Sequence, residues 1–252
     1  MNLRKNLDNC YNFVIKRKRQ EGGFAATPLL PPTIEDTYHA LKIIKDLREF
    51  GLYIDYSPQE DETLKIWLYQ NKTTLREPKN FYQFLRVCLM CNFEIESLKQ
   101  YTNLLFSGII TLERIFYLVK ISELFNLSLP EINKLPFSKV VKDLWMTIYL
   151  SDKGITREKI DKKRLIKYLR ECQNPDGGFG FLPKTTSYID NTYFCLKALN
   201  FLHSGPKDRE SALNFILFSQ TKSGGFGRVP KTASLLDSTF YAVESLRILL
   251  LK

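Results

Sequence analysis

Acidic residues stand just before a threonine at three places in this 252-residue chain, each at the same distance from a Gly-Gly-Phe segment. They are Glu35 with Asp36, then Asp190, then Asp237, and each group begins 13 residues after the first glycine of its segment. Carboxylates that meet at one site raise one another's pKa, and a carboxyl group held protonated can act as an acid. Acids at helix starts are also common N-caps, so Asp190 and Asp237 fit a purely structural role equally well.

The formal charge of +10 is unevenly distributed along the chain. Residues 1–20 carry +5, residues 21–150 carry −2 and residues 151–252 carry +7. We therefore expect an anionic partner, if there is one, to meet the two ends of the chain rather than its middle.

The composition is typical of a folded protein without disulfides. Hydrophobic residues make up 44% of the sequence and charged residues 25%, which excludes a disordered or low-complexity chain. No apolar run reaches the ~18 residues of a membrane-spanning helix, and the N-terminus lacks the apolar core of a signal peptide. Five cysteines, an odd number, suit a reducing compartment, so we expect a cytoplasmic protein. Two histidines argue against a His-rich metal site and a Ser-His-Asp enzyme.

The three acid-threonine sites belong to an internal repeat, with clear copies near residues 3–50, 161–203 and 208–250. The second and third Gly-Gly pairs are 47 residues apart, whereas the first and second are 155 apart, or about 3.3 such units. Degenerate copies should therefore fill the middle, giving about five and a half units in one domain over residues 1–252.

Each copy predicts a helical hairpin, because amphipathic segments precede the Gly-Gly pair and follow the acid. The glycines are expected to end the first helix in a left-handed C-cap, and the acids to cap the second. No segment has the alternation of a strand, so we expect an all-α protein with 11 or 12 helices. Apolar residues recur at helical spacing in the middle of the chain over residues 60–70, 80–91, 95–106, 111–126, 138–150 and 160–172.

Hairpins repeated at this period either stack in an open solenoid or close into a ring. The best copies lie at both ends of the chain, whereas the terminal repeats of a solenoid are usually atypical. The sequence therefore favours a ring in which the first and last copies are neighbours.

The segment from Cys172 to Gly180, followed by Asp190-x-Thr192-Tyr193, resembles the repeat of the prenyltransferase / squalene oxidase family. This family includes protein prenyltransferase β subunits and terpenoid cyclases. The resemblance implies an α/α toroid with inner and outer helices around a central funnel for an isoprenoid chain. It also implies a mouth where the inner helices begin and, for protein prenyltransferases, an α-type partner subunit.

The zinc site of protein prenyltransferases has no equivalent here. The resemblance places two ligands as Asp-x-Cys at the start of an inner helix, where this chain has Thr192 and Thr239 instead. A hydroxyl is a poor substitute for a thiolate, and His39 lies outside the matching register. We therefore expect no zinc and assign no metal ligands, and Mg²⁺ is the ion that would accompany a diphosphate.

The diphosphate-binding pattern of the family is matched by this sequence better than the zinc site is. Its pattern Gly-Arg-x-x-Lys corresponds to the segment from Gly227 to Lys231, although six residues separate Lys231 from Asp237, more than in the family. Arg228 offers a planar donor fork and Lys231 a point charge, which together suit a diphosphate. Lys184 occupies the position of Lys231 in the second copy. The alternative is a solvated basic loop.

Terpenoid cyclases protonate an alkene with the middle Asp of an Asp-x-Asp-Asp-Thr motif. In the nearest segment of this chain, Glu35 falls on that acid, Asp36 on the next, and Thr33 replaces the first. The resemblance thus names Glu35 as the acid of a cyclase-like enzyme.

Aromatic residues are numerous, with 13 Tyr and 18 Phe, and could line a tunnel for an isoprenoid. The candidates in repeat register are Tyr38, Tyr193, Phe240 and Tyr241. Most other aromatic residues are expected in the core.

Two further motifs have a functional and a structural interpretation. The basic run from Lys16 to Arg19 could meet nucleic acid or an anionic membrane, but it also ends a helix, where cations favour the helix dipole. We expect no nucleic-acid partner and keep peripheral membrane contact open. Cys88 and Cys91 form a single CxxC in an apolar helix and are expected to be buried, inert thiols.

The leading hypothesis is a prenyltransferase-like toroid that holds a prenyl diphosphate, with its chain in an aromatic funnel and its head at a basic rim of Arg228, Lys231 and Lys184. Asp190 or Asp237 would orient an unknown acceptor. The alternatives are a cyclase using Glu35 and a non-catalytic scaffold or lipid-binding protein.

Overall fold

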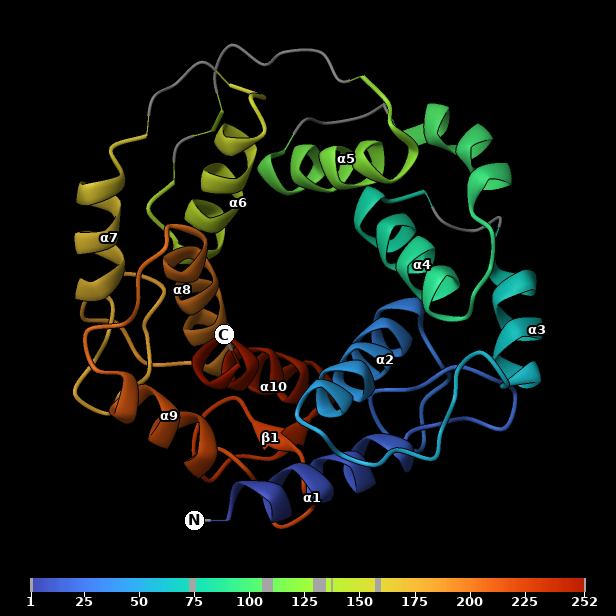
Figure 1. The fold of residues 1–252 in the computed structure, drawn as a ribbon, viewed down its shortest axis with the longest axis horizontal. Helices are drawn as coiled ribbons and strands as arrows, with labels where there is room; N and C mark the ends of the chain where they lie inside the picture. Colours follow the sequence, from blue (N-terminus) through green and yellow to red (C-terminus); the bar gives the residue numbers. More distant parts are fainter. Residues whose placement is uncertain are drawn as a thin grey trace.

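The computed structural model describes residues 2–72, 76–105, 111–128, 135–136, 138–156 and 160–251, apart from the side chain at position 104. These residues form two concentric rings of helices (Figure 1). The inner ring consists of α2 (Ile34–Glu49), α4 (Pro78–Met90), α5 (Leu112–Phe125), α6 (Val141–Asp152), α8 (Ile189–Phe201) and α10 (Leu236–Leu250). The outer helices are α1 (Leu3–Ile15), α3 (Glu62–Asn71), the 3-10 helix η1 (Glu96–Leu105), α7 (Lys162–Glu171) and α9 (Arg209–Phe218). The all-α toroid and the helices expected in the middle of the chain are confirmed, within a few residues.

The inner ring is closed rather than an open arc. Each inner helix packs on the next one along the chain, and α10 packs on both α8 and α2 (Figure 1). The first and last copies are therefore neighbours, as the repeat pattern predicts. Among the described helices, none is long and apolar enough to cross a membrane.

The Gly-Gly pairs do not cap helices, which corrects the expectation from the sequence. Helix α7 ends at Glu171, whereas Gly177 lies in the following loop with a φ of +88°. A Cβ atom on Gly177 would collide with the backbone of Ser211 in α9. In the last repeat, a Cβ on Gly224 would meet the backbone of Asn9 in α1 in the same way. The glycines thus let each loop touch the next outer helix and adopt a left-handed conformation.

The motif threonine holds that loop onto its inner helix. The hydroxyl of Thr192 accepts a hydrogen bond from the backbone N–H of Phe179 at 3.0 Å and donates one to the carbonyl of Tyr188 at 2.8 Å. Thr37 and Thr239 make the equivalent bonds in the other two clear copies. All three threonines are fully buried, so their place in the repeat has a structural explanation.

The acids before these threonines do not cap helices either. Helix α8 has Tyr188 as its N-cap and α10 has Leu235, and neither N-cap side chain bonds to the helix. Asp190 and Asp237 are each the second residue of their helix. Their carboxylates therefore lie at the first turn of each helix, where they can interact with groups at the rim of the ring.

Two short strands, β1 (Phe226–Gly227) and β2 (Ser234–Leu235), form an antiparallel pair before α10. They are a small exception to the expectation of no strands. The pair brings the Gly-Gly-Phe loop against the start of the last inner helix.

Candidate functional site

The inner helices are in register around parts of the ring, so residues at the same position in different helices form layers. At the junction of α2 and α4, second residues pair, with Glu35 and Lys79 at 2.5 Å. At the junction of α10 and α2, the fifth residues Phe240 and Tyr38 have ring centroids 6.0 Å apart. Equal positions meet only if neighbouring helices run parallel. The beginnings of the inner helices therefore share one end of the ring, which we call the mouth.

The mouth is acidic at its first helical turn. The second residues of the six inner helices comprise four acids and two lysines: Glu35, Lys79, Glu113, Lys142, Asp190 and Asp237. Both lysines are paired with acids, Lys79 with Glu35 and Lys142 with Glu113 at 2.9 Å. This layer is distinct from the basic rim of Arg228, Lys231 and Lys184 expected from the sequence, because those cations lie in the loops before α8 and α10.

Arg228 and Asp190, two residues named from the sequence, lie together at the mouth. A guanidinium nitrogen of Arg228 is 3.6 Å from Asp190 Oδ2, and the guanidinium lies 4.1 Å from the ring centre of Tyr188. The backbone carbonyl of Arg228 also accepts a hydrogen bond from Ile189 N–H at 2.9 Å. The Arg228 side chain remains 56% exposed, so its cation is accessible from outside the ring.

Lys184 and Lys231 are exposed and occupy equivalent turns. Both have left-handed backbones, with φ of +65° and +69°. Each turn is closed by the next residue, since Thr185 and Thr232 each donate a 2.8 Å hydrogen bond to a carbonyl three residues earlier. The repeated Pro-Lys-Thr sequence is therefore explained by the turn itself.

The two acids of the first repeat have different protonation tendencies. Burial opposes ionisation of Glu35, but the hydrogen bond and charge of Lys79 outweigh it, so the pKa of Glu35 is lowered. Burial raises the pKa of Asp36 despite its hydrogen bond from Thr33, and the charges of Glu35 and Asp237 add to the increase. Asp36 is thus better suited than Glu35 to retain a proton, which weighs against the acid named from the sequence.

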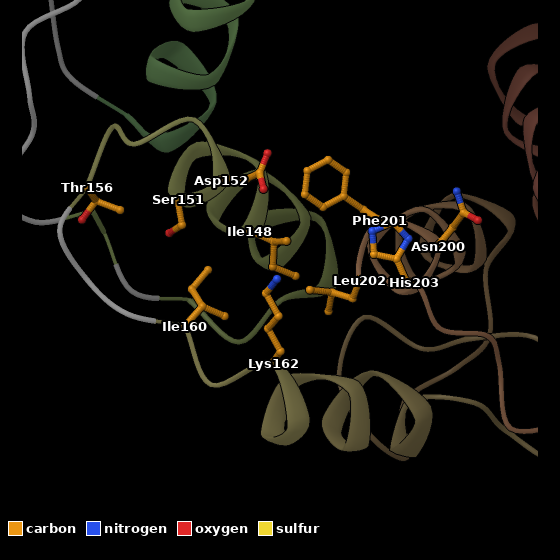
Figure 2. Close-up of a pocket in the computed structure, with 10 residues that line it drawn as sticks. All are labelled: Ile148, Ser151, Asp152, Thr156, Ile160, Lys162, Asn200, Phe201, Leu202 and His203. Carbon is orange, nitrogen blue, oxygen red and sulfur yellow. The ribbon is translucent and has the colours of Figure 1, made fainter.

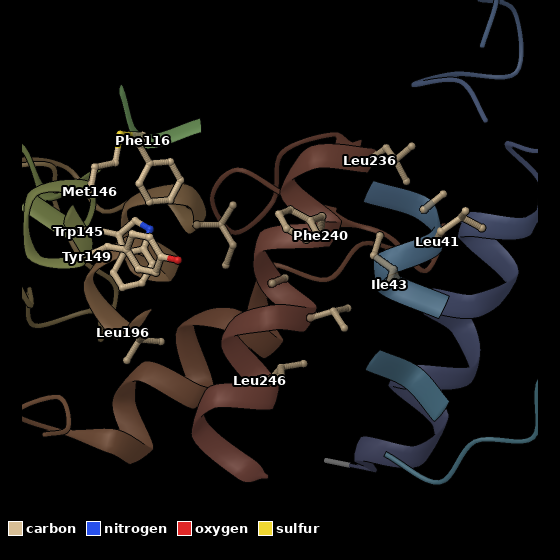
Figure 3. Packing of buried hydrophobic residues seen from close by; sticks show 14 of the residues in the cluster. Leu41, Ile43, Phe116, Trp145, Met146, Tyr149, Leu196, Leu236, Phe240 and Leu246 are labelled. Atoms are coloured by element: carbon tan, nitrogen blue, oxygen red, sulfur yellow. The ribbon is translucent and has the colours of Figure 1, made fainter. Parts of the chain in front are cut away.

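An aromatic layer lies one turn inside the mouth. The fifth residue of every inner helix is aromatic: Tyr38, Tyr82, Phe116, Trp145, Tyr193 and Phe240. Ring centroids are 5.9 Å apart for Tyr193 and Phe240, 6.5 Å for Tyr38 and Tyr82, and 6.3 Å for Phe116 and Trp145. Figure 3 shows Phe116 and Trp145 on one side of this layer and Phe240 on another.

Three of the aromatic candidates from the sequence, Tyr38, Tyr193 and Phe240, belong to this layer, and Tyr241 contacts Tyr193 at 5.2 Å. The other three members were missed because their repeats lack the Gly-Gly-Phe segment from which the helices can be numbered. The ring centroids of Tyr82 and Tyr117 are 5.7 Å apart, so the aromatic contacts continue from α4 to α5.

A second layer, which sequence reasoning missed, lies one turn deeper. The ninth residues of the inner helices form what we call the inner cationic layer: Lys42, Arg86, Lys120, Tyr149, Lys197 and Glu244. The signal was present in the three clear copies, where the fifth residue after the motif threonine is charged each time. Burial lowers the pKa of both Lys120 and Lys197 to about 8.

The described residues contain no cluster of three or more His, Cys, Asp or Glu side chains that could hold a metal ion. His39 is buried and stacks on Phe240 with ring centroids 4.5 Å apart. Burial lowers the pKa of His39 to about 4, so the imidazole is neutral at pH 7.

The basic run from Lys16 to Arg19 and the CxxC segment mainly have structural roles. Arg17 donates to the carbonyl of Phe13 at 2.6 Å, and Lys18 pairs with Asp61 at 3.0 Å. These cations therefore join α1 to its own loop and to the next outer helix. Cys88 and Cys91 are buried, and burial raises the pKa of each thiol to about 12, so neither is a reactive thiolate.

A cavity of about 920 Å³ lies at the end of the ring away from the mouth (Figure 2). It is bounded by the last residues of α6 and α8 and by the start of α7, with Asp152, Lys162 and His203 among its polar residues. Thr156 and Ile160 also line it, and residues 157–159 between them are outside the described part of the chain. We assign no function to this cavity.

The family model of the prenyltransferase alpha-alpha toroid domain matches residues 2–81, 142–233 and 184–251, which together cover well over half of the sequence. No curated protein matches the chain. The matched regions contain the three clear repeats and the whole of inner helices α2, α8 and α10, together with α6 from its second residue and the first four residues of α4. The chain therefore belongs to the prenyltransferase alpha-alpha toroid domain family.

Proposed function

We propose that this protein is prenyltransferase-like and holds an isoprenoid chain against the aromatic layer. The observation behind this proposal is that all six inner helices have an aromatic residue at their fifth position, and that these rings contact one another between α2 and α4, α2 and α10, α5 and α6, and α8 and α10. A set of ring faces around one axis offers apolar contact to a branched hydrocarbon and can stabilise positive charge on an allylic carbon. Tyr38 and Tyr82 are only partly buried, so these rings retain surface for a guest.

The diphosphate of such a guest would bind at the mouth in the transferase form of this proposal. Arg228 would exchange its 3.6 Å pair with Asp190 for two phosphate oxygens, and Lys231 and Lys184 would add point charges from the neighbouring turns. Mg²⁺ would share the diphosphate charge. Asp190 and Asp237 would then orient the acceptor at the first turn of α8 and α10.

The test is calorimetric titration of farnesol and farnesyl diphosphate into the wild type and two matched variants. Tyr82→Leu removes a ring from the aromatic layer, and Tyr69→Leu removes an exposed ring from outer helix α3. We expect Tyr82→Leu to weaken both ligands about fivefold, since one aromatic contact contributes about 0.5–1.5 kcal/mol. Equal affinities for all three proteins, or no binding by the wild type, would remove the proposal in favour of a scaffold.

Cyclisation is the second candidate function, and the raised pKa of Asp36 favours it. A protonated Asp36 carboxyl could deliver its proton to an alkene, as the general acid of the reaction. Product analysis with a linear polyprenyl substrate should lose cyclic products in Asp36→Asn and keep them in Glu35→Gln. Loss in Glu35→Gln alone would instead support the acid named by the resemblance.

A further inference from the structure

The inner cationic layer is an unusual feature for the interior of a ring. Four of its six residues are cations, namely Lys42, Arg86, Lys120 and Lys197, and one, Glu244, is an acid. Four residues of α-helix separate it from the aromatic layer, which corresponds to about 6 Å. Positive charge is therefore concentrated deeper than the aromatic rings, whereas the first turn of the mouth is mostly acidic.

These side chains share one space inside the ring. Lys42 Nζ reaches Glu244 Oε1 at 2.9 Å between α2 and α10. Lys197 on α8 interacts electrostatically with both Lys42 on α2 and Lys120 on α5. Neither α2 nor α5 is next to α8 in the ring (Figure 1), so these interactions cross the lumen.

The acids of the region are already shared among other cations. Glu244 pairs with both Lys42 and Arg247, the latter at 3.0 Å. Asp46, buried beside them, contacts the same two cations at 3.2 and 3.7 Å. Among the described residues, these acids lie closest to Lys42, and Glu244 also attracts Lys197 through its charge without a contact within 4 Å.

Lys120 and Lys197 are two cations of the layer that no acid compensates closely. The acid closest to Lys120 is Glu123 at 3.9 Å, and Glu123 is held more tightly by Lys153 at 2.9 Å. Lys197 donates a hydrogen bond to the hydroxyl of Tyr193. Within the described chain, no carboxylate lies within 4 Å of Lys197. A partly buried cation without a close acid is costly, and an anion bound between such cations would reduce that cost.

We propose that the inner cationic layer binds the anionic head, a carboxylate or a phosphate, of an amphiphile whose apolar part crosses the aromatic layer toward the mouth. The guest then lies with its head inward, opposite to one whose diphosphate sits at Arg228. The inference rests on the proposed function only for the apolar part of the guest.

The experiment compares three probes of equal chain length by calorimetric titration: dodecanol, dodecanoate and dodecyl phosphate. The affinity for dodecanol measures binding to the aromatic layer alone, because dodecanol has no charge. Comparison of dodecanoate with dodecyl phosphate distinguishes a carboxylate site from a phosphate site. We expect at least one anion to bind about tenfold or more tightly than dodecanol, as one well-placed buried charge pair can supply.

The variants identify where the charge is recognised. Lys120→Met and Lys197→Met should each reduce the anion preference about tenfold while leaving dodecanol binding unchanged. Lys163→Met with Lys207→Met, which removes two exposed cations outside the mouth, is the matched control and should keep the preference. Loss of the preference in Arg228→Met with Lys231→Met, and not in the inner variants, would place the anionic head at the mouth and overturn the proposal.

Wild-type protein gives a second measurement that needs no variant. The charged or titratable groups at this level are those of the inner cationic layer together with Asp46, Glu123, Lys153 and Arg247. Binding of dodecanoate at pH 8 should take up protons, because a nearby anion favours the charged lysines. The proton uptake is read from the dependence of binding heat on buffer ionisation enthalpy.

The outcomes separate the two proposals. Dodecanol binding without any anion preference or proton uptake would overturn the anion site and leave the isoprenoid proposal standing. Failure of all three probes would overturn both.

Discussion

The side-chain amide of Gln220 donates a 2.7 Å hydrogen bond to the backbone carbonyl of Asn6, 214 residues away in the sequence. Gln173 makes the same bond one repeat earlier, to the carbonyl of Asp208 at 2.6 Å. In the first repeat, Lys18 takes this place and pairs with Asp61 at the start of α3. The contact that closes the ring is therefore the ordinary contact between successive repeats, and closure needs no special device.

Replacing Gln220 by Ala should open the junction between α1 and the last repeat. We expect the free energy of unfolding to fall by about 1 kcal/mol, because a partly buried hydrogen bond between the last repeat and α1 is lost. Denaturant unfolding measures this loss, and hydrogen exchange should increase in α1. Gln20→Ala, at an exposed position of the first loop, is the control and should leave both unchanged.

Gly177→Ala should be strongly destabilising. The alanine would have to keep a φ of +88° and also clear the backbone of Ser211, so we expect a loss of about 3 kcal/mol or more. Gly154→Ala is a matched control, since Gly154 has a φ of +70° and open space around its Cα. Its loss should be only about 1 kcal/mol, the cost of the left-handed backbone. Equal losses in thermal unfolding would show that the close approach is unimportant.

The sequence predicts the ring because the residues of the repeated Gly-Gly-Phe and threonine motif are the ones that make the contacts within and between successive repeats. Gly177 and Thr192 each make a contact that few other residue types can make, so their spacing is visible at three places. The helices of the middle are visible only through their apolar spacing. Their bounds are right within a few residues, but their register in the ring cannot be read without the motif.

The layers of the lumen were harder to predict for the same reason. Tyr82 and Trp145 occupy the same position in their helices as Tyr193, but only Tyr193 follows a recognisable motif. Asp is frequent at N-caps, so the sequence leaves that role open for Asp190, whereas the backbone places Asp190 at the second position of α8. The sequence cannot place Lys197 in the lumen, because a single lysine is usually on the surface, and only the closed ring shows that it faces other helices.

The diphosphate head at the mouth can be tested with Arg228→Ala combined with Lys231→Ala. We expect affinity for a farnesyl or geranylgeranyl diphosphate analogue to fall by about 100-fold, since two charged contacts of about 1.5 kcal/mol each are removed. The control is Lys163→Ala with Lys207→Ala, which removes two exposed cations outside the mouth. Unchanged affinity in the first double variant, measured by titration calorimetry, would rule out diphosphate binding at these residues.

The stability of the protein should respond to pH through Lys197. Its pKa of about 8 in the folded chain lies below the usual 10.5, so between these values the unfolded chain holds a proton that the folded chain has lost. Below pH 8 both states are protonated and the folded state bears the full cost of the buried charge, and this cost disappears as the pH rises toward 10.5. Lys197→Met should therefore be about 1–3 kcal/mol more stable than the wild type at pH 7, with a smaller difference at pH 10. Lys163→Met, exposed on α7, controls for the loss of one lysine and should show no such dependence in denaturant unfolding. A difference for Lys197→Met that stays constant between pH 7 and pH 10 would mean that the ammonium is stabilised by its surroundings rather than strained by burial.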